Sequence, residues 1–390
     1  MNTVEFKDSP VGRIPVDWDV VSLGEVVDQR RESIQPAGEG KNNFVGLEHI
    51  RSGETKLCEY VSDEGIRSTK YRFYTGDILY GKLRPYLDKA VLADINGICS
   101  TDLIVLTPSD RIIPEFLIYF IHTNQFIQRA VSTTSGTNHP RTSWKAISKF
   151  RMALPPLEEQ KRISEILQDV DGAIEKVNKE IGVTEKLKRG LMQRLLMEGI
   201  NHTEFKDSPV GRIPVDWDVV KLGDLFTFKN GKRPPVLNEG EIPIYGANGK
   251  MGLTSNYLKT KDKALIFGRV GSSGEVHLSK GCVWVSDNAI YTESYDSKRV
   301  NVHFMFYLIK FKDLKRFATK TTHPIITQTF INNFKVPLPP LEEQKRISEI
   351  LQDVDRRLEL LTERKVKLEN IKRGLMNDLL TGKRRVRITS

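Results

Sequence analysis

Two long stretches of the chain carry a helical pattern of apolar and polar positions. Within residues 154–200 and 338–382, apolar side chains recur at spacings of three and four, which predicts amphipathic helices with a heptad-like coiled-coil seam. The predicted seam positions are Ile163, Ile166, Val170, Ile174, Val177, Ile181, Leu187, Leu191 and Leu195 in the first stretch, and Ile347, Ile350, Val354, Leu358, Leu361, Leu368, Ile371, Leu375 and Leu379 in the second. Each helix of roughly 40 residues would be about 60 Å long, at about 1.5 Å per residue.

The first of these helices has a clear start signal. Pro155-Pro156 can end a strand and begin a helix, because proline suits the first helical position. Glu158 and Glu159 follow in the first turn, where carboxylates interact favourably with the helix dipole. Near the other end, Gly190 and its counterpart Gly374 are poor helix residues, so each marks either a point of close approach or an early helix end.

Neither helix can bury its apolar stripe alone. The simplest solution is that the two pack on each other within one chain, most simply in antiparallel orientation. The alternative is a coiled coil between two copies of the chain. The remaining faces carry nearly balanced charges, as solvated helices do.

The helices belong to a duplication that covers the whole chain. The segment Glu5–Val21, called block A, recurs without change at Glu204–Val220. The segment Leu154–Asp171, called block B, recurs without change at Leu338–Asp355, and a looser match continues to the two KRGLM sequences at 188–192 and 372–376. The segments between the blocks, residues 22–153 and 221–337, differ. Unless the duplication is recent and has no functional meaning, this pattern predicts two modules that keep the same geometry while doing different work.

The two variable segments share a faint order of elements. Each has a strand-like run followed by a glycine and a basic residue, at 76–84 and 264–274, and a small polar cluster, at 99–102 and 285–288. A helix is expected near 114–130 and near 301–317, before a polar loop. The sequence therefore predicts an α/β (α+β) fold with two mixed domains and two long helices. The predicted boundaries are 1–153 for the first domain, 154–200 for the first helix, 201–337 for the second domain, 338–382 for the second helix and 383–390 for a basic tail.

The loops of both variable segments hold residue types that contact DNA. Arginine and lysine pair with guanine or phosphate, asparagine pairs with adenine, and serine and threonine contact either bases or phosphate. Each single residue could equally have an ordinary loop role, so the prediction rests on recurrence in both modules. The candidates are Lys82, Arg84, Asn138, His139 and Arg141 in the first, and Asn248, Lys250, Arg269, Ser272, Ser273, Thr322 and His323 in the second.

Charge and cysteine content narrow the class of protein. The formal net charge is +10, and residues 199–339 carry an excess of seven basic side chains whereas residues 1–155 are balanced. This excess favours a polyanionic partner, although a solvated basic surface would look the same. The three cysteines lie far apart, which argues against a disulfide framework and fits a reducing cytoplasm. No apolar run reaches the length of a membrane span, and the first ten residues do not resemble a signal peptide.

Motifs typical of enzymes are missing from the sequence. The chain has no G-x-x-x-x-G-K-[ST] loop, no NPPY-type methyltransferase motif and no His/Cys set with the spacing of zinc ligands. Glu363 and Lys365 resemble the end of a nuclease motif but lie in a predicted helix. We therefore expect no catalytic residues and no metal site in this chain.

Block A, block B and the KRGLM segments together identify a family. The chain resembles the specificity (S) subunit of type I restriction–modification enzymes. The motifs that carry the resemblance are IPVDW at the start of each half, the paired LPPLEEQKRISEIL segments, KRGLM near each helix end, and the stretches YGANGKMG and GKLRPYLDKA. The resemblance covers essentially the whole chain. It implies that each domain reads one half of a split site in double-stranded DNA, and that the helices act as a ruler for the unread spacer.

The resemblance also implies partners. Two methyltransferase (M) subunits would bind S-adenosylmethionine and methylate adenine. Two motor-nuclease (R) subunits, which use ATP and Mg, could join the complex. All of these cofactors would bind the partner subunits, so we expect no cofactor on this chain and no contact with a membrane. The two long helices and block A would be the surfaces that dock the M subunits. From the residues alone, Trp18 and Trp217 are expected in the core, and Arg13 and Arg212 are structural or touch phosphate. The rival hypotheses are a protein-binding scaffold without DNA specificity and a self-contained nuclease or methyltransferase.

Overall fold

The chain forms two compact units, each built from both halves of the duplicated sequence. In the computed structural model, residues 5–234, 240–258, 263–317 and 325–386 are described. Unit 1 consists of Met1–Val177 with Arg364–Ser390, and unit 2 consists of Asn178–Glu363. The long helices α4 (Leu157–Leu195) and α7 (Leu341–Leu379) contribute one end to each unit.

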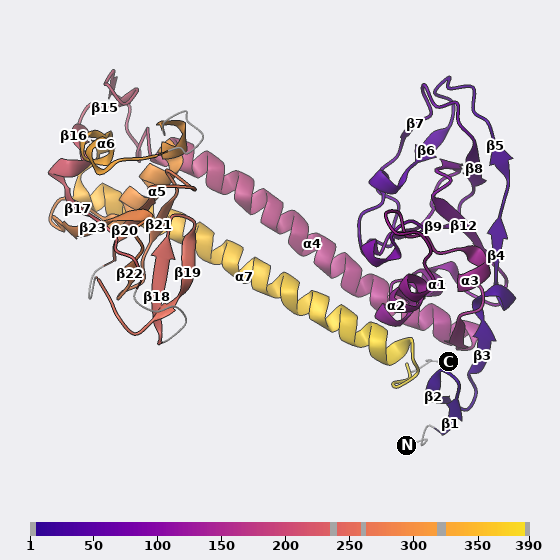
Figure 1. Cartoon of the computed structure of the whole chain (residues 1–390). Coiled ribbons are helices and arrows are strands. Elements are labelled where there is room, and N and C mark those ends of the chain that lie inside the picture. The colour runs from indigo at the N-terminus through magenta and orange to yellow at the C-terminus, as the bar shows by residue number, and fades with distance from the viewer. Residues whose placement is uncertain (1–4, 235–239, 259–262, 318–324, 387–390) are drawn as a thin grey trace. The chain divides into compact units, whose positions relative to one another are not determined.

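Unit 1 combines sheets with short helices beside the first turns of α4 (Figure 1). Its helices are α1 (Pro114–Ile121), α2 (Asn124–Ser132) and α3 (Trp144–Ile147). Its strands are β1 (Phe6–Ser9), β2 (Gly12–Pro15), β3 (Asp19–Ser22), β4 (Val27–Arg30), β5 (Ser33–Ile34), β6 (Asn43–Val45), β7 (Val61–Ser62), β8 (Lys70–Phe73), β9 (Ile78–Gly81), β10 (Ala90–Leu92), β11 (Gly97–Cys99), β12 (Leu103–Pro108) and β13 (Arg151–Leu154).

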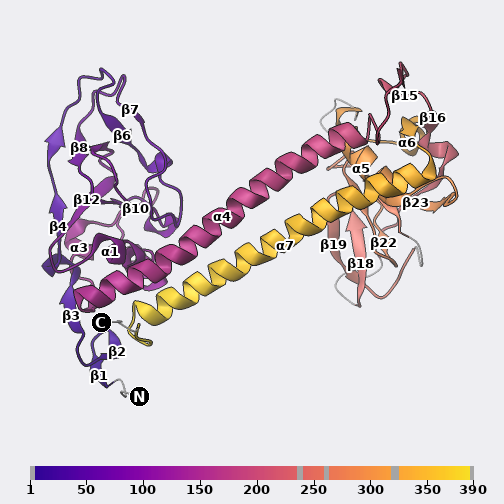
Figure 2. The same cartoon turned by 180° about the vertical axis from the view of Figure 1, so that it is seen from behind.

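Unit 2 repeats this plan, and its sheets and α5 are seen from the other side in Figure 2. Its short helices are α5 (Val302–Lys312) and α6 (Gln328–Asn333). Its strands are β14 (Phe205–Lys206), β15 (Ile213–Pro214), β16 (Asp218–Lys221), β17 (Phe226–Asn230), β18 (Ile242–Gly246), β19 (Gly249–Thr254), β20 (Leu265–Gly268), β21 (Val276–Leu278), β22 (Trp284–Val285), β23 (Ala289–Tyr295) and β24 (Lys335–Leu338).

The strand orders of the two units correspond. The four-stranded sheet runs β10-β9-β12-β4 in unit 1 and β21-β20-β23-β17 in unit 2. In a separate two-stranded sheet, a strand at the end of block A pairs with the last strand of its module, as β3–β13 in unit 1 and β16–β24 in unit 2. A second sheet contains a parallel pair in each unit, β6–β11 and β18–β22. Among the described residues, this sheet has five strands in unit 1 and three in unit 2. The duplication expected from the sequence is therefore a duplication of the fold, and the mixed α/β class is confirmed.

Block B attaches each long helix to its module through a buried glutamine. Gln160 accepts a hydrogen bond from the Ile113 backbone N–H at 2.9 Å and donates to the carbonyls of Arg111 and Pro155. In unit 2, Gln344 repeats this with Asn301, Arg299 and Pro339. These bonds have lengths of 2.8–2.9 Å. The invariant sequence thus holds each helix against the start of α1 or α5.

Salt bridges within each unit establish that the helices pair antiparallel. In unit 1, Lys372 of α7 bonds Asp171 of α4 at 2.7 Å, and Asp171 accepts a hydrogen bond from the Tyr119 hydroxyl. In unit 2, Lys188 of α4 bonds Asp355 of α7. The KRGLM lysine of each copy therefore bonds the block B aspartate of the other copy, which confirms antiparallel packing inside one chain.

The predicted apolar seam is correct in part. Ile163 and Val177 of α4 and Ile347 and Leu361 of α7 are buried. Ile371, by contrast, is 51% exposed. Leu187 and Ile350 are also exposed, whereas Leu167 and Leu351, which the predicted stripe left out, are fully buried. The reason is that the helix ends pack into module cores, which shifts the buried face away from an ideal two-helix seam.

The expected early helix end at Gly190 and Gly374 is wrong, and no close approach to these glycines occurs within the described part of the chain. Each glycine lies inside its helix, which continues for five residues, to Leu195 and Leu379. A side chain added at either position would meet no atom of this chain within 4 Å. Neither a close approach within the chain nor a helix end explains these glycines.

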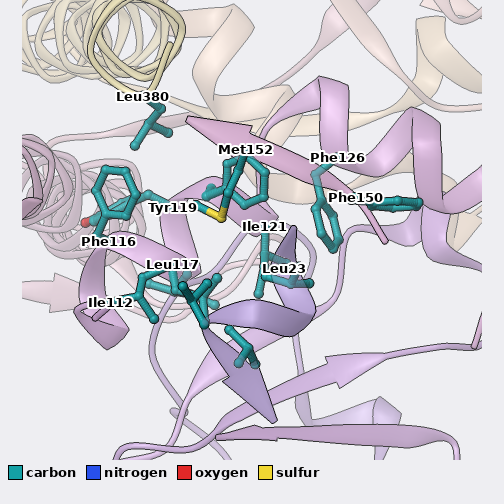
Figure 3. Packing of buried hydrophobic residues seen from close by; sticks show 14 of the residues in the cluster. Leu23, Ile112, Phe116, Leu117, Tyr119, Ile121, Phe126, Phe150, Met152 and Leu380 are labelled. Carbon is teal, nitrogen blue, oxygen red and sulfur yellow. The ribbon is translucent and has the colours of Figure 1, made fainter. Parts of the chain in front are cut away.

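The core of unit 1 includes residues from both ends of the sequence. Figure 3 shows Leu380, which follows α7, beside Phe116 and Tyr119 of α1 and Met152 of β13. Trp18 and Trp217 are fully buried, as expected, and Arg13 and Arg212 lie over the rings of Phe6 and Phe205. The C-terminal end of α7 is therefore required to complete the first module.

A buried carboxylate closes unit 1 where the tail follows α7. Glu159 is 0% exposed, accepts a hydrogen bond from the Trp18 indole at 2.9 Å and pairs with Arg385 at 2.5 Å. Arg385 also binds both carboxylate oxygens of Asp17, and its hydrogen bond to Glu159 is the main cause of its raised pKa. The sequence assigned Arg385 to a basic tail and Glu159 to the helix dipole. In the structure, the two neutralise each other inside unit 1.

Unit 2 has the same junction with a histidine in place of the arginine. Glu343 accepts a hydrogen bond from the Trp217 indole at 3.0 Å and lies 2.8 Å from Nε2 of His202, whose Nδ1 lies 3.3 Å from Asp216. Gly199 and Gly382 lie three positions before His202 and Arg385, with φ +71° each. A Cβ at Gly199 would lie 2.5 Å from Glu343 and 2.8 Å from Trp217, and a Cβ at Gly382 would lie 2.5 Å from Pro15. The tail after α7 thus supplies the basic side chain that contacts the block B glutamate of unit 1, and the segment after α4 supplies the corresponding side chain in unit 2.

Candidate nucleic-acid interface

The predicted loops of unit 1 come together at one place. Lys82 follows β9, and its N–H donates to the Asp102 carbonyl at 3.0 Å while its carbonyl accepts from Thr142. Arg84 donates its backbone N–H to Pro140 at 2.8 Å and its guanidinium to the Asn138 carbonyl at 3.3 Å. The turn after β9 and the polar loop 135–141 therefore form one surface.

This surface has an unusual backbone that another residue holds in place. Arg84 and Asp88 flank a short 3₁₀ turn and both adopt left-handed conformations, with φ of 51° and 50°. Such conformations are uncommon for residues other than glycine and are often found at functional sites. The buried ring of His122 contacts Asp88 at 2.7 Å and the Ala90 carbonyl at 3.0 Å. His122 thereby anchors the turn that presents Lys82 and Arg84.

Arg141 has a partner within the chain. Its Nε donates to Asp102 at 2.9 Å, and this hydrogen bond is the main cause of its raised pKa. A further nitrogen reaches the carbonyl of His139 at 3.4 Å, whereas the side chains of Asn138 and His139 are exposed. The predicted residues of unit 1 thus gather at one surface, where Arg141 also positions the loop.

The main chain of unit 2 reproduces this arrangement. The Arg269 N–H donates to the Asn288 carbonyl at 2.9 Å, and the Arg269 carbonyl accepts from Ile326 at 3.1 Å. These two bonds correspond to those of Lys82 with Asp102 and Thr142. Lys82 and Arg269 are therefore equivalent residues, as the shared glycine–basic pattern predicted.

Three further candidates of unit 2 lie around one cavity. Asn248, Lys250 and Ser272 line a cavity of about 400 Å³ beside the turn that carries Arg269. Ser273 differs, because its side chain is 5% exposed and donates to the Arg269 carbonyl at 2.6 Å. We therefore assign Ser273 to the shape of the turn and not to the exposed surface. Thr322 and His323 fall outside the described residues.

The two surfaces differ in charge at equivalent positions. Asp102 of unit 1 corresponds to Asn288 of unit 2, and Arg141 corresponds to Ile325, because Leu83 and Val270 pair with Arg141 and Ile325 in the same way. An ion pair in the first module is thus replaced by an amide and an apolar side chain in the second. Equal backbones with different side chains are what two modules of different specificity need.

Several residues at these surfaces were not among the predicted contacts. No local sequence pattern could have identified His122 and Asp88, because the two residues are 34 positions apart in the chain. Ser286 and Asn288 belong to the polar cluster 285–288, which matches the cluster 99–102. That match could have pointed to Ser286 and Asn288, because equivalent clusters of two homologous modules occupy equivalent places.

A metal-type grouping occurs in the described part of the chain at His202, Asp216 and Glu343. Each ring nitrogen of His202 faces a carboxylate, and Arg385 occupies the equivalent place in unit 1. An arginine cannot bind a metal ion, so we interpret both groupings as ion-pair clusters. Among the described helices, none is long and apolar enough to cross a membrane.

Together, these features define a protein with two homologous recognition modules and paired long helices. A family model described as the type I restriction modification DNA specificity domain matches residues 15–185 and again residues 214–370. The chain therefore belongs to the family of type I restriction–modification DNA specificity subunits.

Relatives support this membership over the full length. The chain is 30% identical to a protein of Methanocaldococcus jannaschii named putative type I restriction enzyme MjaX specificity subunit, covering 98% of this chain and 97% of that one. It is 29% identical to the MjaVIII specificity subunit of the same organism, over 98% and 96%. The type I restriction–modification S subunit of M. genitalium shares the fold, with a TM-score of 0.66 at 18% identity over 100% and 98% of the two chains.

Proposed function

We propose that this chain is the non-catalytic sequence-reading subunit of a type I restriction–modification complex, in which unit 1 reads one half of a bipartite DNA site and unit 2 reads the other. The observation that carries this proposal is the equivalent placement of Lys82 and Arg269, each on a turn held by the same two backbone hydrogen bonds. The side chains around the turns differ, which suits two different half-sites.

The proposed partners follow from the duplication. Two M subunits are identical, so they need two identical docking surfaces, and block A and block B occur twice without change. The exposed Gly190 and Gly374 lie at equivalent places on α4 and α7, where a partner backbone could approach closely. In this proposal, S-adenosylmethionine, ATP and Mg bind the M and R subunits.

Methylation mapping tests the proposal directly. Genomic DNA from cells that express this chain with its M subunit is compared with DNA from cells that express M alone. We expect a split motif with methyl-adenine in both halves only when this chain is present. Absence of new methylation, with M active beside another S subunit, would favour the protein-binding scaffold.

Single substitutions assign the half-sites. Lys82→Ala is expected to weaken binding to one half-site by about tenfold, and Arg269→Ala to weaken the other, because a good base contact contributes about 1–3 kcal/mol. The measurement is the affinity of the S–M complex for duplexes that retain only one correct half-site. Equal losses at both halves for either variant would indicate general phosphate binding or misfolding.

A further inference from the structure

The cavity of unit 2 has a buried hydroxyl in its lining. Ser286 is 1% exposed and lines the cavity together with Asn248, Lys250 and Ser272. Its Oγ has no hydrogen-bond partner within the described part of the chain. A buried hydroxyl without a partner is destabilising, so its presence at a cavity wall indicates that a ligand or a bridging water supplies the partner.

Glycines keep this cavity open. A Cβ at Gly246 would lie 2.9 Å from the Met251 sulfur and 3.5 Å from Ser286 Oγ. A Cβ at Gly268, below the turn of Arg269, would lie 2.2 Å from the Ser272 carbonyl. Gly246 therefore leaves space next to the unpartnered hydroxyl, and Gly268 allows the turn of Arg269 to fold back closely on Ser272.

The polar groups around the cavity match one kind of base pair. The amides of Asn248 and Asn288 each offer a donor beside an acceptor, which is the pattern that adenine presents at N7 and N6 in the major groove. Met251 offers an apolar surface for a thymine methyl group. A carboxylate, which would favour cytosine, is missing from the described lining. In unit 1 the place of Asn288 is taken by Asp102, which is paired with Arg141.

We propose that this cavity reads an A·T base pair of the second half-site, with Ser286 as a specificity-determining residue that bonds the base directly or through one water. The inference rests on the proposed function, because it assumes that unit 2 binds DNA. Lys250, which is exposed, would contact the phosphate backbone. Ser286 and Asn288 together would then set the base preference at one position.

The test combines a protein change with a DNA change. The affinity of the S–M complex is measured for the full site and for duplexes in which the base pairs of the second half-site are replaced one at a time, A·T by G·C and G·C by A·T. For the wild type, replacement of the read pair should weaken binding by about tenfold or more. For Ser286→Ala, the full site should bind about tenfold less tightly, and the same replacement should cause little further loss.

The substitution separates recognition from folding. Removal of an unpartnered buried hydroxyl should leave the melting temperature unchanged or raise it, since no internal hydrogen bond is lost. Ser100→Ala in unit 1 is the matched control, because Ser100 Oγ already accepts from the Asp102 N–H, and it should show no coupling to the second half-site. Gly246→Ala, which narrows the cavity, should reproduce the effect of Ser286→Ala.

The outcomes distinguish the two proposals. If Ser286→Ala and Gly246→Ala bind every duplex of the second half-site as the wild type does, the cavity does not read a base, although the proposed function stands. Coupling at a G·C pair would instead overturn the A·T assignment. A wild-type complex that shows no preference for any bipartite site, with M shown to be active, would contradict the proposed function itself.

Discussion

Arg385 shows how much the role of a charged residue depends on its partners. In the sequence it belongs to a basic C-terminal tail, where a polyanionic ligand would be the natural inference. In the structure it bonds Asp17 and the buried Glu159, which also accepts the Trp18 indole N–H. A buried carboxylate left without its cation is strongly destabilising.

The first prediction concerns this ion pair. Arg385→Ala should lower the free energy of unfolding of unit 1 by about 3 kcal/mol, because it leaves a buried charge uncompensated. Urea denaturation of the full chain measures the loss. Arg384→Ala is the matched control, since Arg384 forms an exposed pair with Asp378 and its removal should change stability by less than about 1 kcal/mol. Equal effects of the two variants would contradict the assigned role of Arg385.

The second prediction concerns thiol reactivity. Burial raises the pKa of the Cys99 thiol to about 12, whereas Cys58 and Cys282 are exposed. The thiolate is the reactive form, so at pH 8 Cys99 would be almost entirely in the unreactive thiol form. Iodoacetamide at pH 8 should therefore modify Cys58 and Cys282 in the folded chain. Mass spectrometry should find Cys99 modified only after unfolding, and early labelling of Cys99 would mean that the core of unit 1 opens readily.

At the scale of the element, reciprocal pairing defines the two long helices. Lys372 and Lys188 occupy the same position in the two copies of KRGLM, and each bonds the aspartate of the opposite copy. The hydroxyls of Tyr119 and Tyr307 donate to these same aspartates, and desolvation is the first cause that raises the pKa of both tyrosines. Each unit thereby locks one end of α4 to one end of α7.

A double-mutant cycle tests this lock. Lys372→Ala and Asp171→Asn should show a coupling energy of about 1 kcal/mol in unfolding experiments, because the two side chains are in direct contact. Lys372→Ala and Asp355→Asn, which lie in different units, should show none. Coupling in the second cycle would point to helix pairing different from the one described.

Substitution of the exposed helical glycines should stabilise the chain, in contrast to the substitutions above. Gly190→Ala and Gly374→Ala should each stabilise the isolated chain by about 0.5–1 kcal/mol, since alanine is the better helix former and its Cβ meets no atom of the chain. Urea denaturation measures this gain. If a partner backbone approaches these positions, as proposed, the same variants will form the S–M complex less well. A loss of stability in the isolated chain would show that the glycines serve the fold itself.

At the scale of the whole molecule, chain order and structural unit do not coincide. Unit 1 contains the first module and the C-terminal end, and unit 2 contains the second module and the middle of the chain. The end of α7 and the residues that follow it complete the core around Trp18 and Leu380. Removal of the residues after α7 should therefore damage the module that is encoded first.

The proposed ruler makes a quantitative prediction at this scale. Insertion of one heptad at equivalent positions of α4 and α7 adds about 10 Å to each helix, at about 1.5 Å per residue. That length corresponds to about three base pairs, at about 3.4 Å per pair. Methylation mapping should find both half-sites unchanged and the spacer longer. Altered half-sites with an unchanged spacer would be incompatible with a ruler.

The sequence by itself determined the duplication, the two long helices, the mixed α/β modules and most of the basic loops. These features are local or repetitive, so apolar periodicity, proline and glycine positions and identical blocks reveal them. Lys82 and Arg269 could be matched in this way because each follows a strand-like run ending in glycine. Antiparallel pairing could be expected, but its register could not.

Only the tertiary structure decided which charges are neutralised and which polar groups lack a partner. Glu159 and Arg385 are 226 positions apart, so no local pattern relates them. The buried face of α4 and α7 was likewise decided by the module cores, which cover Leu167 and Leu351 and leave Ile371 exposed. The unpartnered hydroxyl of Ser286 arises where segments distant in the chain enclose a cavity, because burial and hydrogen bonding depend on neighbours in space.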